Sequence, residues 1–130
     1  MTEKELSQYF YLKKEIEDLE ERIIKLGDGV GSIVITDMPS GSPELVSIQE
    51  KISELRSKYF EARISALEQY IKIENYINEI EDSELRTMFR MRFLDLNNWE
   101  KIGRKFHMDR TTAYRNCINY INLHKIHTNI

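Results

Sequence analysis

Apolar residues recur along two long stretches of the chain at alternating intervals of three and four. In the stretch from residue 6 to residue 26 they are Tyr9, Leu12, Ile16, Leu19, Ile23 and Leu26. In the stretch that starts near Pro43, after the candidate helix cap Ser42, they are Leu45, Ile48, Ile52, Leu55, Tyr59, Ala62, Ala66, Tyr70, Ile73, Ile77 and Ile80. Such spacing is typical of the heptad seam of an amphipathic helix. The pattern therefore predicts two long helices, each with one apolar stripe to bury.

The two expected helices differ in length. At about 1.5 Å per residue the second is roughly 55 Å long and the first about 30 Å. They can pair as an antiparallel hairpin along part of the longer helix, or each can pair with a second copy in a homodimeric coiled coil, and the sequence leaves both open. The far end of the second helix, from about Tyr70, must pack on the residues that follow it or on a second subunit.

The segment between these helices is rich in residues that interrupt regular structure. Four of the five glycines and both prolines fall between Gly27 and Pro43. Gly27 is expected to end the first helix as a C-cap, which leaves residues 27–43 as a loop. The apolar run Ser32–Thr36 has no partner strand, so we expect an extended loop that covers a hydrophobic patch. The role of this loop stays open.

Beyond residue 82 the pattern changes to three short helices. Asp82 or Ser83 is the expected cap of the first. Its apolar and flanking positions are Leu85, Met88, Phe89, Arg92 and Phe93. Residues 95–98 break it, and Asn98 is the expected cap of a second short helix. On one face that helix carries Trp99, Ile102 and Phe106.

A tight turn at His107–Met108 precedes the third short helix. Asp109 is its expected cap, and it runs from Arg110 to about Leu123. Its inward stripe consists of Ala113, Cys117 and Ile121. The chain is therefore expected to be all-α, with a long helical hairpin, or coiled-coil-like arm, at residues 1–82 and a three-helix unit at residues 83–130.

The last two short helices have the pattern of a helix-turn-helix, whose second helix enters the major groove of DNA. The small Gly103 allows that second helix to approach closely. The expected base-reading residues are Arg110, Thr111, Thr112, Arg115, Asn116 and Asn119. Arginine matches guanine, asparagine matches adenine, and threonine can meet the thymine methyl group. The expected phosphate contacts, which set register without reading sequence, are Lys101, Arg104, Lys105 and Tyr114.

Charge is divided unevenly along the chain. Residues 1–83 contain 10 Lys and Arg against 18 Asp and Glu, a balance of −8, and residues 84–130 contain 9 against 4, a balance of +5, which together give the net charge of −3. This asymmetry favours a polyanion as partner of the C-terminal part. The alternatives are that the two parts attract each other, or that the uneven distribution of charge has no function.

Several C-terminal motifs resemble region four of bacterial sigma factors. They are Trp99-Glu100-Lys101-Ile102-Gly103, Phe106-His107-Met108-Asp109 and Arg110-Thr111-Thr112-Ala113-Tyr114-Arg115, and the preceding segment from Leu85 to Phe93 is similar to the helix that leads into them. The wider layout, including the segment Thr36-Asp37-Met38-Pro39-Ser40-Gly41, resembles phage and prophage proteins of the sigma-region-four-like group, among them late-gene transcription regulators of Gram-positive phages.

Two positions depart from the pattern of that group. His107 stands where glycine is usual in the turn, and a positive φ there costs a non-glycine residue roughly 1 kcal/mol. Ala113 stands where valine is frequent. The resemblance implies DNA binding in transcription control. Because the chain has no room for a promoter-melting region, it implies a regulator that contacts RNA polymerase, in the cytoplasm of a bacterial host cell.

Other function classes find little support in the sequence. The single cysteine, Cys117, excludes an internal disulfide and a multi-cysteine zinc site, and it is expected to be a small buried hydrophobe. His124 and His127 lack a nearby acid or thiolate, so no metal or cofactor is expected. No apolar run reaches the ~20 residues that span a bilayer, and no signal peptide is visible, so no membrane partner is expected.

The carboxylates of the first helix lie on its outward side, and no catalytic arrangement of side chains is present. We therefore expect a non-enzyme. The leading hypothesis is a DNA-binding transcriptional regulator whose arm forms a homodimer or contacts polymerase. The alternative is a protein-interaction module, in which the arm of a phage protein binds and inhibits a host protein and the three-helix unit does not bind DNA.

Overall fold

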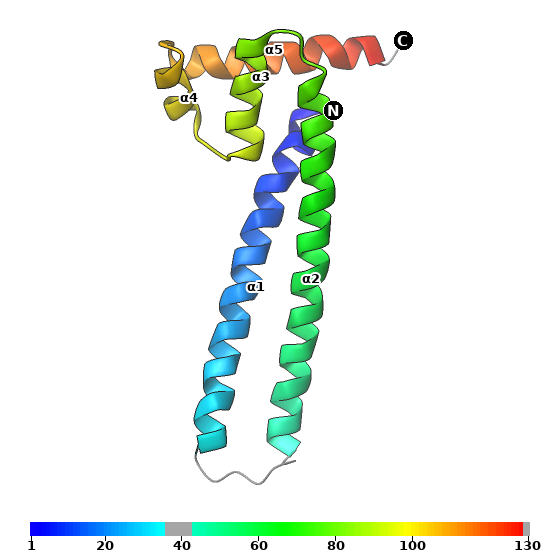
Figure 1. Ribbon diagram of the computed structural model, residues 1–130, viewed down its shortest axis with the longest axis vertical. Coiled ribbons are helices and arrows are strands. Elements are labelled where there is room, and N and C mark those ends of the chain that lie inside the picture. Colours follow the sequence, from blue (N-terminus) through cyan, green and yellow to red (C-terminus); the bar gives the residue numbers. More distant parts are fainter. Residues whose placement is uncertain (36–42, 129–130) are drawn as a thin grey trace. The chain divides into compact units, whose positions relative to one another are not determined.

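The computed structural model describes the backbone of residues 1–35 and 43–128 and the side chains of residues 1–27 and 45–124. The elements are α1 (Glu3–Ile35), α2 (Pro43–Asn78), α3 (Ser83–Phe89), the π-helical turn η1 (Arg90–Leu94), α4 (Trp99–Lys105) and α5 (Arg110–Thr128). No strand occurs in the described residues, which confirms the all-α class (Figure 1). None of the described helices is both long enough and apolar enough to cross a lipid bilayer.

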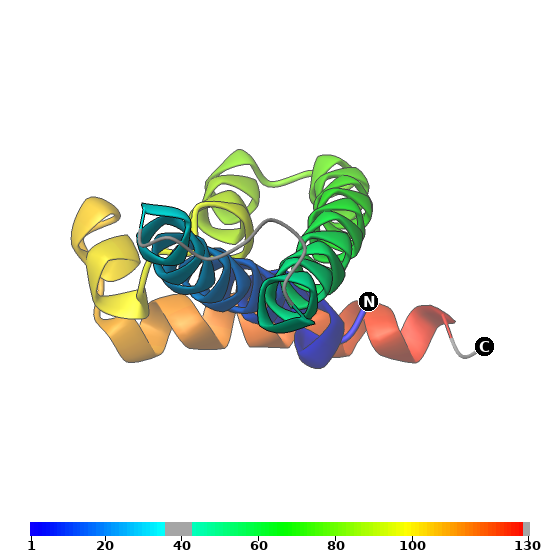
Figure 2. The same ribbon diagram turned by 90° about the horizontal axis from the view of Figure 1, so that it is seen from below.

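One compact unit, residues 12–66, consists of parts of the two long helices. In this unit α1 and α2 lie side by side and run antiparallel (Figures 1 and 2). Their contact is made by the seam that the sequence predicts. Leu19, Leu55 and Ala62 of this seam form one buried cluster, packed with Ile16, Ile23, Leu26 and Tyr59. Heptad spacing thus gives this unit a narrow apolar core between two otherwise charged helices.

The expected end of the first helix at Gly27 is wrong. Helix α1 continues to Ile35, so residues 27–35 of the expected loop are helical. A glycine costs a helix only about 1 kcal/mol relative to alanine, whereas each added residue of a growing helix gains one backbone hydrogen bond. The rest of the expected loop, residues 36–42, lies outside the described residues. Pro43 begins α2, as its fixed φ predicts.

The other compact unit contains residues 1–11 and 67–130. Its core joins the start of α1 and the end of α2 to the short helices, and Leu6, Ile73, Ile77, Phe89 and Ile102 in it are fully buried. The far end of α2 therefore packs on the residues that follow it, which was one of the two alternatives. The compact units divide the chain after residues 11 and 66, whereas the sequence suggested one boundary after residue 82.

Aromatic rings hold the elements of this unit together. The ring of Phe89 lies 5.5 Å from that of Phe93, 5.6 Å from Tyr120 and 6.0 Å from Tyr76, measured between centroids. The ring of Trp99 lies 6.3 Å from that of Phe93. These tilted and edge-on contacts are the favourable arrangements of aromatic pairs. They connect α2, α3, η1, α4 and α5 within one core.

The break expected after the first short helix is present and has a clear local form. The Asp95 N–H donates to the Arg90 carbonyl at 2.9 Å, which closes the wider turn of η1. Leu96 then takes a positive φ of 61°, which ends the helical path. At the other end, the side chain of Asp82 accepts hydrogen bonds from the N–H groups of Glu84 and Leu85, so Asp82 is the cap of α3.

Candidate nucleic-acid interface

Helix α4 starts where the sequence predicts it. Asn98 has extended backbone angles, and its side-chain oxygen accepts a hydrogen bond from the Lys101 N–H at 2.8 Å. This satisfies one of the N–H groups that a helix leaves unpaired at its start. On the inward face of α4, Ile102 is fully buried and Trp99 and Phe106 are partly buried against the same core.

The turn after α4 is a Schellman motif. The Met108 N–H donates to the Gly103 carbonyl at 2.9 Å, and the His107 N–H donates to the Arg104 carbonyl at 3.4 Å. These are the two hydrogen bonds that define the motif, in which the residue after the cap takes the left-handed conformation. That residue is His107, with φ 56°. The positive dihedral expected at this position is therefore present, without the glycine that usually provides it.

Gly103 is required by the close approach of the chain that leads into α5. A Cβ atom at this position would lie 2.6 Å from the Met108 carbonyl oxygen and 3.2 Å from the Arg110 nitrogen. Both atoms belong to the backbone, so no side-chain rotation relieves the contact. The small residue thus fixes how tightly α5 begins against α4, as the sequence predicts.

Helix α5 begins immediately after Asp109, whose carbonyl accepts the first helical hydrogen bond, from the Ala113 N–H at 3.0 Å. Asp109 therefore occupies the expected cap position. The inward stripe is formed by Ala113, Cys117 and Ile121, which are 0 %, 0 % and 2 % exposed. These three residues belong to the core of this unit, so the opposite side of α5 faces away from that core. Figure 2 shows α4 beside the N-terminal end of α5.

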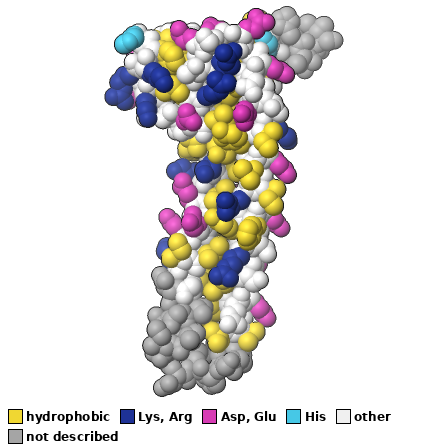
Figure 3. Space-filling view, in the orientation of Figure 1, with side chains coloured by type: hydrophobic (Ala, Val, Ile, Leu, Met, Phe, Trp, Pro, Cys, Tyr) yellow, Lys and Arg dark blue, Asp and Glu magenta, His cyan; other side chains and the backbone are white. Residues whose placement is uncertain are grey.

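All ten residues expected to contact DNA are exposed. They are Lys101, Arg104, Lys105, Arg110, Thr111, Thr112, Tyr114, Arg115, Asn116 and Asn119. None of the five cations among them forms an ion pair with a carboxylate in the part of the chain that the structure describes. Figure 3 shows Lys and Arg side chains gathered over the α4 end of this unit. The positive charge is therefore available to an external partner.

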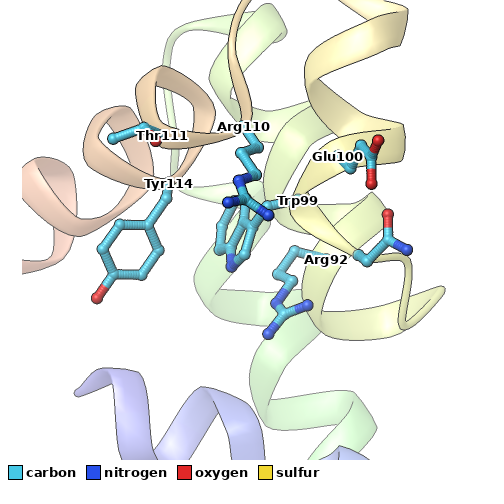
Figure 4. Close-up of a pocket in the computed structure, with 7 residues that line it drawn as sticks. Arg92, Trp99, Glu100, Arg110, Thr111 and Tyr114 are labelled. Atoms are coloured by element: carbon cyan, nitrogen blue, oxygen red, sulfur yellow. The ribbon is translucent and has the colours of Figure 1, made fainter.

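The expected base-reading residues fall into two groups on α5. At 100° per residue, Thr111, Thr112, Arg115, Asn116 and Asn119 share the side opposite the buried stripe. Arg110, in contrast, lies on the side of α4, and Figure 4 shows its side chain beside Trp99. Asn116 also makes a contact within the chain, since its side-chain nitrogen lies 3.8 Å from the Met108 sulfur.

A pocket of about 480 Å³ lies between the start of α4 and the start of α5. It is lined by Arg92, Asn98, Trp99, Glu100, Arg110, Thr111 and Tyr114 (Figure 4). The Trp99 ring meets the Tyr114 ring edge-on at 5.5 Å, and the Arg92 guanidinium lies 4.9 Å from the centroid of Trp99. Trp99 is thus a packing residue, as expected.

Sequence reasoning did not assign Arg92 to this surface. The Arg92 guanidinium donates to the Asn97 carbonyl at 3.1 Å, which holds it beside the pocket. One feature of the sequence could have indicated this. Arg92 directly precedes the apolar Phe93, so the two side chains point in different directions and Arg92 lies away from the core. The helical period alone did not show that it reaches Trp99, because the two residues belong to different elements.

Cys117 and His124 were considered as reactive or metal-binding groups, and both pack against neighbouring residues. Burial raises the pKa of the Cys117 thiol to about 12, partly opposed by Arg92, so it is a buried hydrophobe and a poor nucleophile. The His124 ring stacks on Tyr120 at 3.9 Å, and the side chain of His127 lies outside the described residues. The described residues contain no cluster of three or more His, Cys, Asp or Glu that could hold a metal ion.

Comparison of the chain with protein-family models, with curated proteins and with solved structures finds no match.

Proposed function

We propose that the protein binds duplex DNA through the start of α5 and regulates transcription, as a helix-turn-helix protein of the phage and prophage type that resembles region four of sigma factors. The observation that carries the proposal is an exposed face on α5 with Arg115 and two asparagines, directly after a tight turn and next to the three exposed cations of α4. These cations have no carboxylate partner in the described residues, so they are free to neutralise phosphates.

The two groups of α5 residues have different roles in this proposal. Arg115, Asn116 and Asn119 lie on the outer side of the helix and are proposed to meet base edges, together with Thr111 and Thr112. Arg110 lies on the other side of the helix, toward Trp99 (Figure 4), and is proposed to contact the DNA backbone. Lys101, Arg104 and Lys105 of α4 are proposed to contact phosphates and set the register.

Duplex DNA is the proposed partner, and RNA polymerase and a second copy of the chain are further proposed partners. The resemblance to sigma region four supports polymerase, and the exposed apolar side chains of α2 support a protein partner for the arm. Those side chains also favour the second candidate function, a protein-interaction module without DNA binding. We propose no catalytic function and no cofactor.

The experiment is a titration of labelled duplex DNA, followed by fluorescence anisotropy at several salt concentrations. Affinity is expected to fall steeply with salt, through release of counterions. Lys105→Ala is expected to weaken binding of all sequences alike and to reduce the salt slope by about one. Arg22→Ala, which removes the same charge from an exposed position of α1, is the matched control and is expected to have little effect.

The sequence-reading role is tested with a selected site. Arg115→Ala is expected to cost roughly 1–3 kcal/mol, and the loss is confined to one base position. If the Arg110→Ala, Arg115→Ala double variant binds that site as tightly as the wild type, the proposed docking is wrong. Absence of DNA binding even at low salt, with capture of a host protein by the arm, would support the interaction module instead.

A further inference from the structure

Helix α2 carries a second apolar stripe besides the seam that packs against α1. Four large side chains on it are strongly exposed: Phe60 by 62 %, Ile64 by 55 %, Leu67 by 62 % and Ile71 by 56 %. Their spacing of four, three and four is again that of a heptad. At 100° per residue, this stripe is centred roughly 130° around the helix from the buried seam. Hydrophobic side chains are visible on the surface of the long helices in Figure 3.

The order of residue types in the stripe is informative. In heptad notation Ile64 and Ile71 occupy a positions, and Phe60 and Leu67 occupy d positions. In parallel coiled coils, β-branched residues at a with leucine at d favour two strands over higher oligomers. Because α2 is one helix from Pro43 to Asn78, these positions follow each other on one face without a break. A second α2 is therefore a suitable occupant.

The charges beside the stripe point to the same arrangement. Arg56 and Arg63 are at g positions, and Glu61 and Glu68 are at e positions. In a parallel, in-register pair, each g residue faces the e residue five positions later on the other helix, so Arg56 meets Glu61 and Arg63 meets Glu68 of the second copy. An antiparallel pair would instead bring arginine against arginine and glutamate against glutamate.

All four of these charged residues are exposed, and none forms an ion pair in the described part of the chain. The neighbouring Glu54, in contrast, is already paired, with Lys58 at 3.1 Å and Lys51 at 3.8 Å. Arg63 is held by a cation–π contact, with its guanidinium 5.6 Å from the centroid of the Tyr59 ring. In the described residues, none of the four charges is thus neutralised by an opposite charge of its own chain.

We infer that two copies of the chain associate through Phe60, Ile64, Leu67 and Ile71 of α2, as a parallel and in-register pair of helices. This names the surface and the orientation of the dimer proposed above, and it holds whether or not α5 binds DNA. The helix is already formed in each monomer, so association does not have to order it, which lowers the entropic cost of binding.

The first experiment tests whether the apolar stripe is needed for association. Sedimentation equilibrium between about 1 and 100 µM is expected to show a concentration-dependent dimer, in the range of affinity of a small apolar interface. Ile64→Lys is expected to weaken association at least about tenfold. The matched control is Ile24→Lys, since Ile24 is also 55 % exposed on a long helix but has no apolar neighbours on its face. Circular dichroism is the check that both variants remain helical.

The orientation is tested by cross-linking and charge exchange. Phe60→Cys is expected to form a disulfide-linked dimer under mild oxidation, because d residues of a parallel pair face their own counterparts. An antiparallel pair centred on the stripe would place these cysteines about 16 Å apart, too far for a disulfide. The wild-type chain is the control, because its single cysteine is buried.

Arg63→Glu and Glu68→Arg are each expected to weaken the dimer, and the double variant is expected to restore it. A monomer at every concentration overturns the inference. So does a dimer that Ile64→Lys leaves intact, or one that forms no Phe60→Cys disulfide. These outcomes are independent of the DNA titration, so a failure of one proposal is distinguishable from a failure of the other.

Discussion

Replacing Gly103 by alanine tests how tightly α4 and α5 are joined. The added Cβ would lie 2.6 Å from the Met108 carbonyl oxygen, whereas carbon and oxygen in close contact lie about 3.3 Å apart, so the backbone must move by about 0.7 Å. Such overpacking costs roughly 1–3 kcal/mol. Alanine returns up to about 1 kcal/mol through its higher helix propensity. The two terms together leave a net loss of stability of about 0–2 kcal/mol.

The matched control is Gly27→Ala in α1, where an added Cβ meets no atom within 4 Å. Helix propensity acts alone there, so this variant is expected to gain up to about 1 kcal/mol. The stability of both variants is measured by thermal unfolding. Circular dichroism and the fluorescence of Trp99, the only tryptophan, monitor the transition. A loss of 1 kcal/mol lowers the midpoint by about 4–8 °C in a unit of this size. If Gly103→Ala gains as much stability as Gly27→Ala, the reasoning about the close approach is refuted.

Three further substitutions or measurements have defined outcomes. His107→Gly is expected to stabilise the protein by about 0.5 kcal/mol and His107→Val to destabilise it by about 1 kcal/mol in urea unfolding, because only glycine adopts φ 56° without strain. Tyr76→Phe is expected to leave stability unchanged or raise it by about 1 kcal/mol, since the buried Tyr76 hydroxyl has no hydrogen-bond partner in the described residues, and a loss would reveal one. Burial raises the pKa of Cys117 from 9.0 to about 12, so its contribution to stability is complete below pH 9 and is lost as the pH rises toward 12. Unfolding midpoints between pH 8 and pH 11 should fall less in Cys117→Ala than in the wild type, and equal slopes would contradict this.

Much of this fold follows from short-range rules that act within one element. Heptad spacing identified the seam residues that pack between α1 and α2. Asn98 was recognisable as a cap from residue type, and Asp82 was one of the two candidates for the cap of α3. The tight turn at His107–Met108 was also predicted from the sequence, because it separates a short helical pattern from the next expected cap, Asp109. His107 takes the left-handed conformation there because the Schellman hydrogen bonds stabilise it.

Other features depend on small differences in free energy, or on contacts between residues far apart in the sequence, and local sequence patterns do not show these. Gly27 did not stop α1, because the cost of one glycine is smaller than the gain from continuing the helix. The compact units do not follow the chain order, since Leu6 shares a core with Ile73 and Phe89. The sequence also placed Arg110 with the base-reading residues, whereas the structure turns it toward Trp99.

The central claim is that the outer face at the start of α5 reads the sequence of duplex DNA. The most direct measurement is selection of random duplex DNA by the purified protein, repeated with Arg115→Ala. The wild type is expected to enrich a defined motif, and the variant is expected to lose its preference at one base pair of that motif while it keeps the others. No enriched motif from the wild type, or the same motif in full from the variant, would contradict the claim.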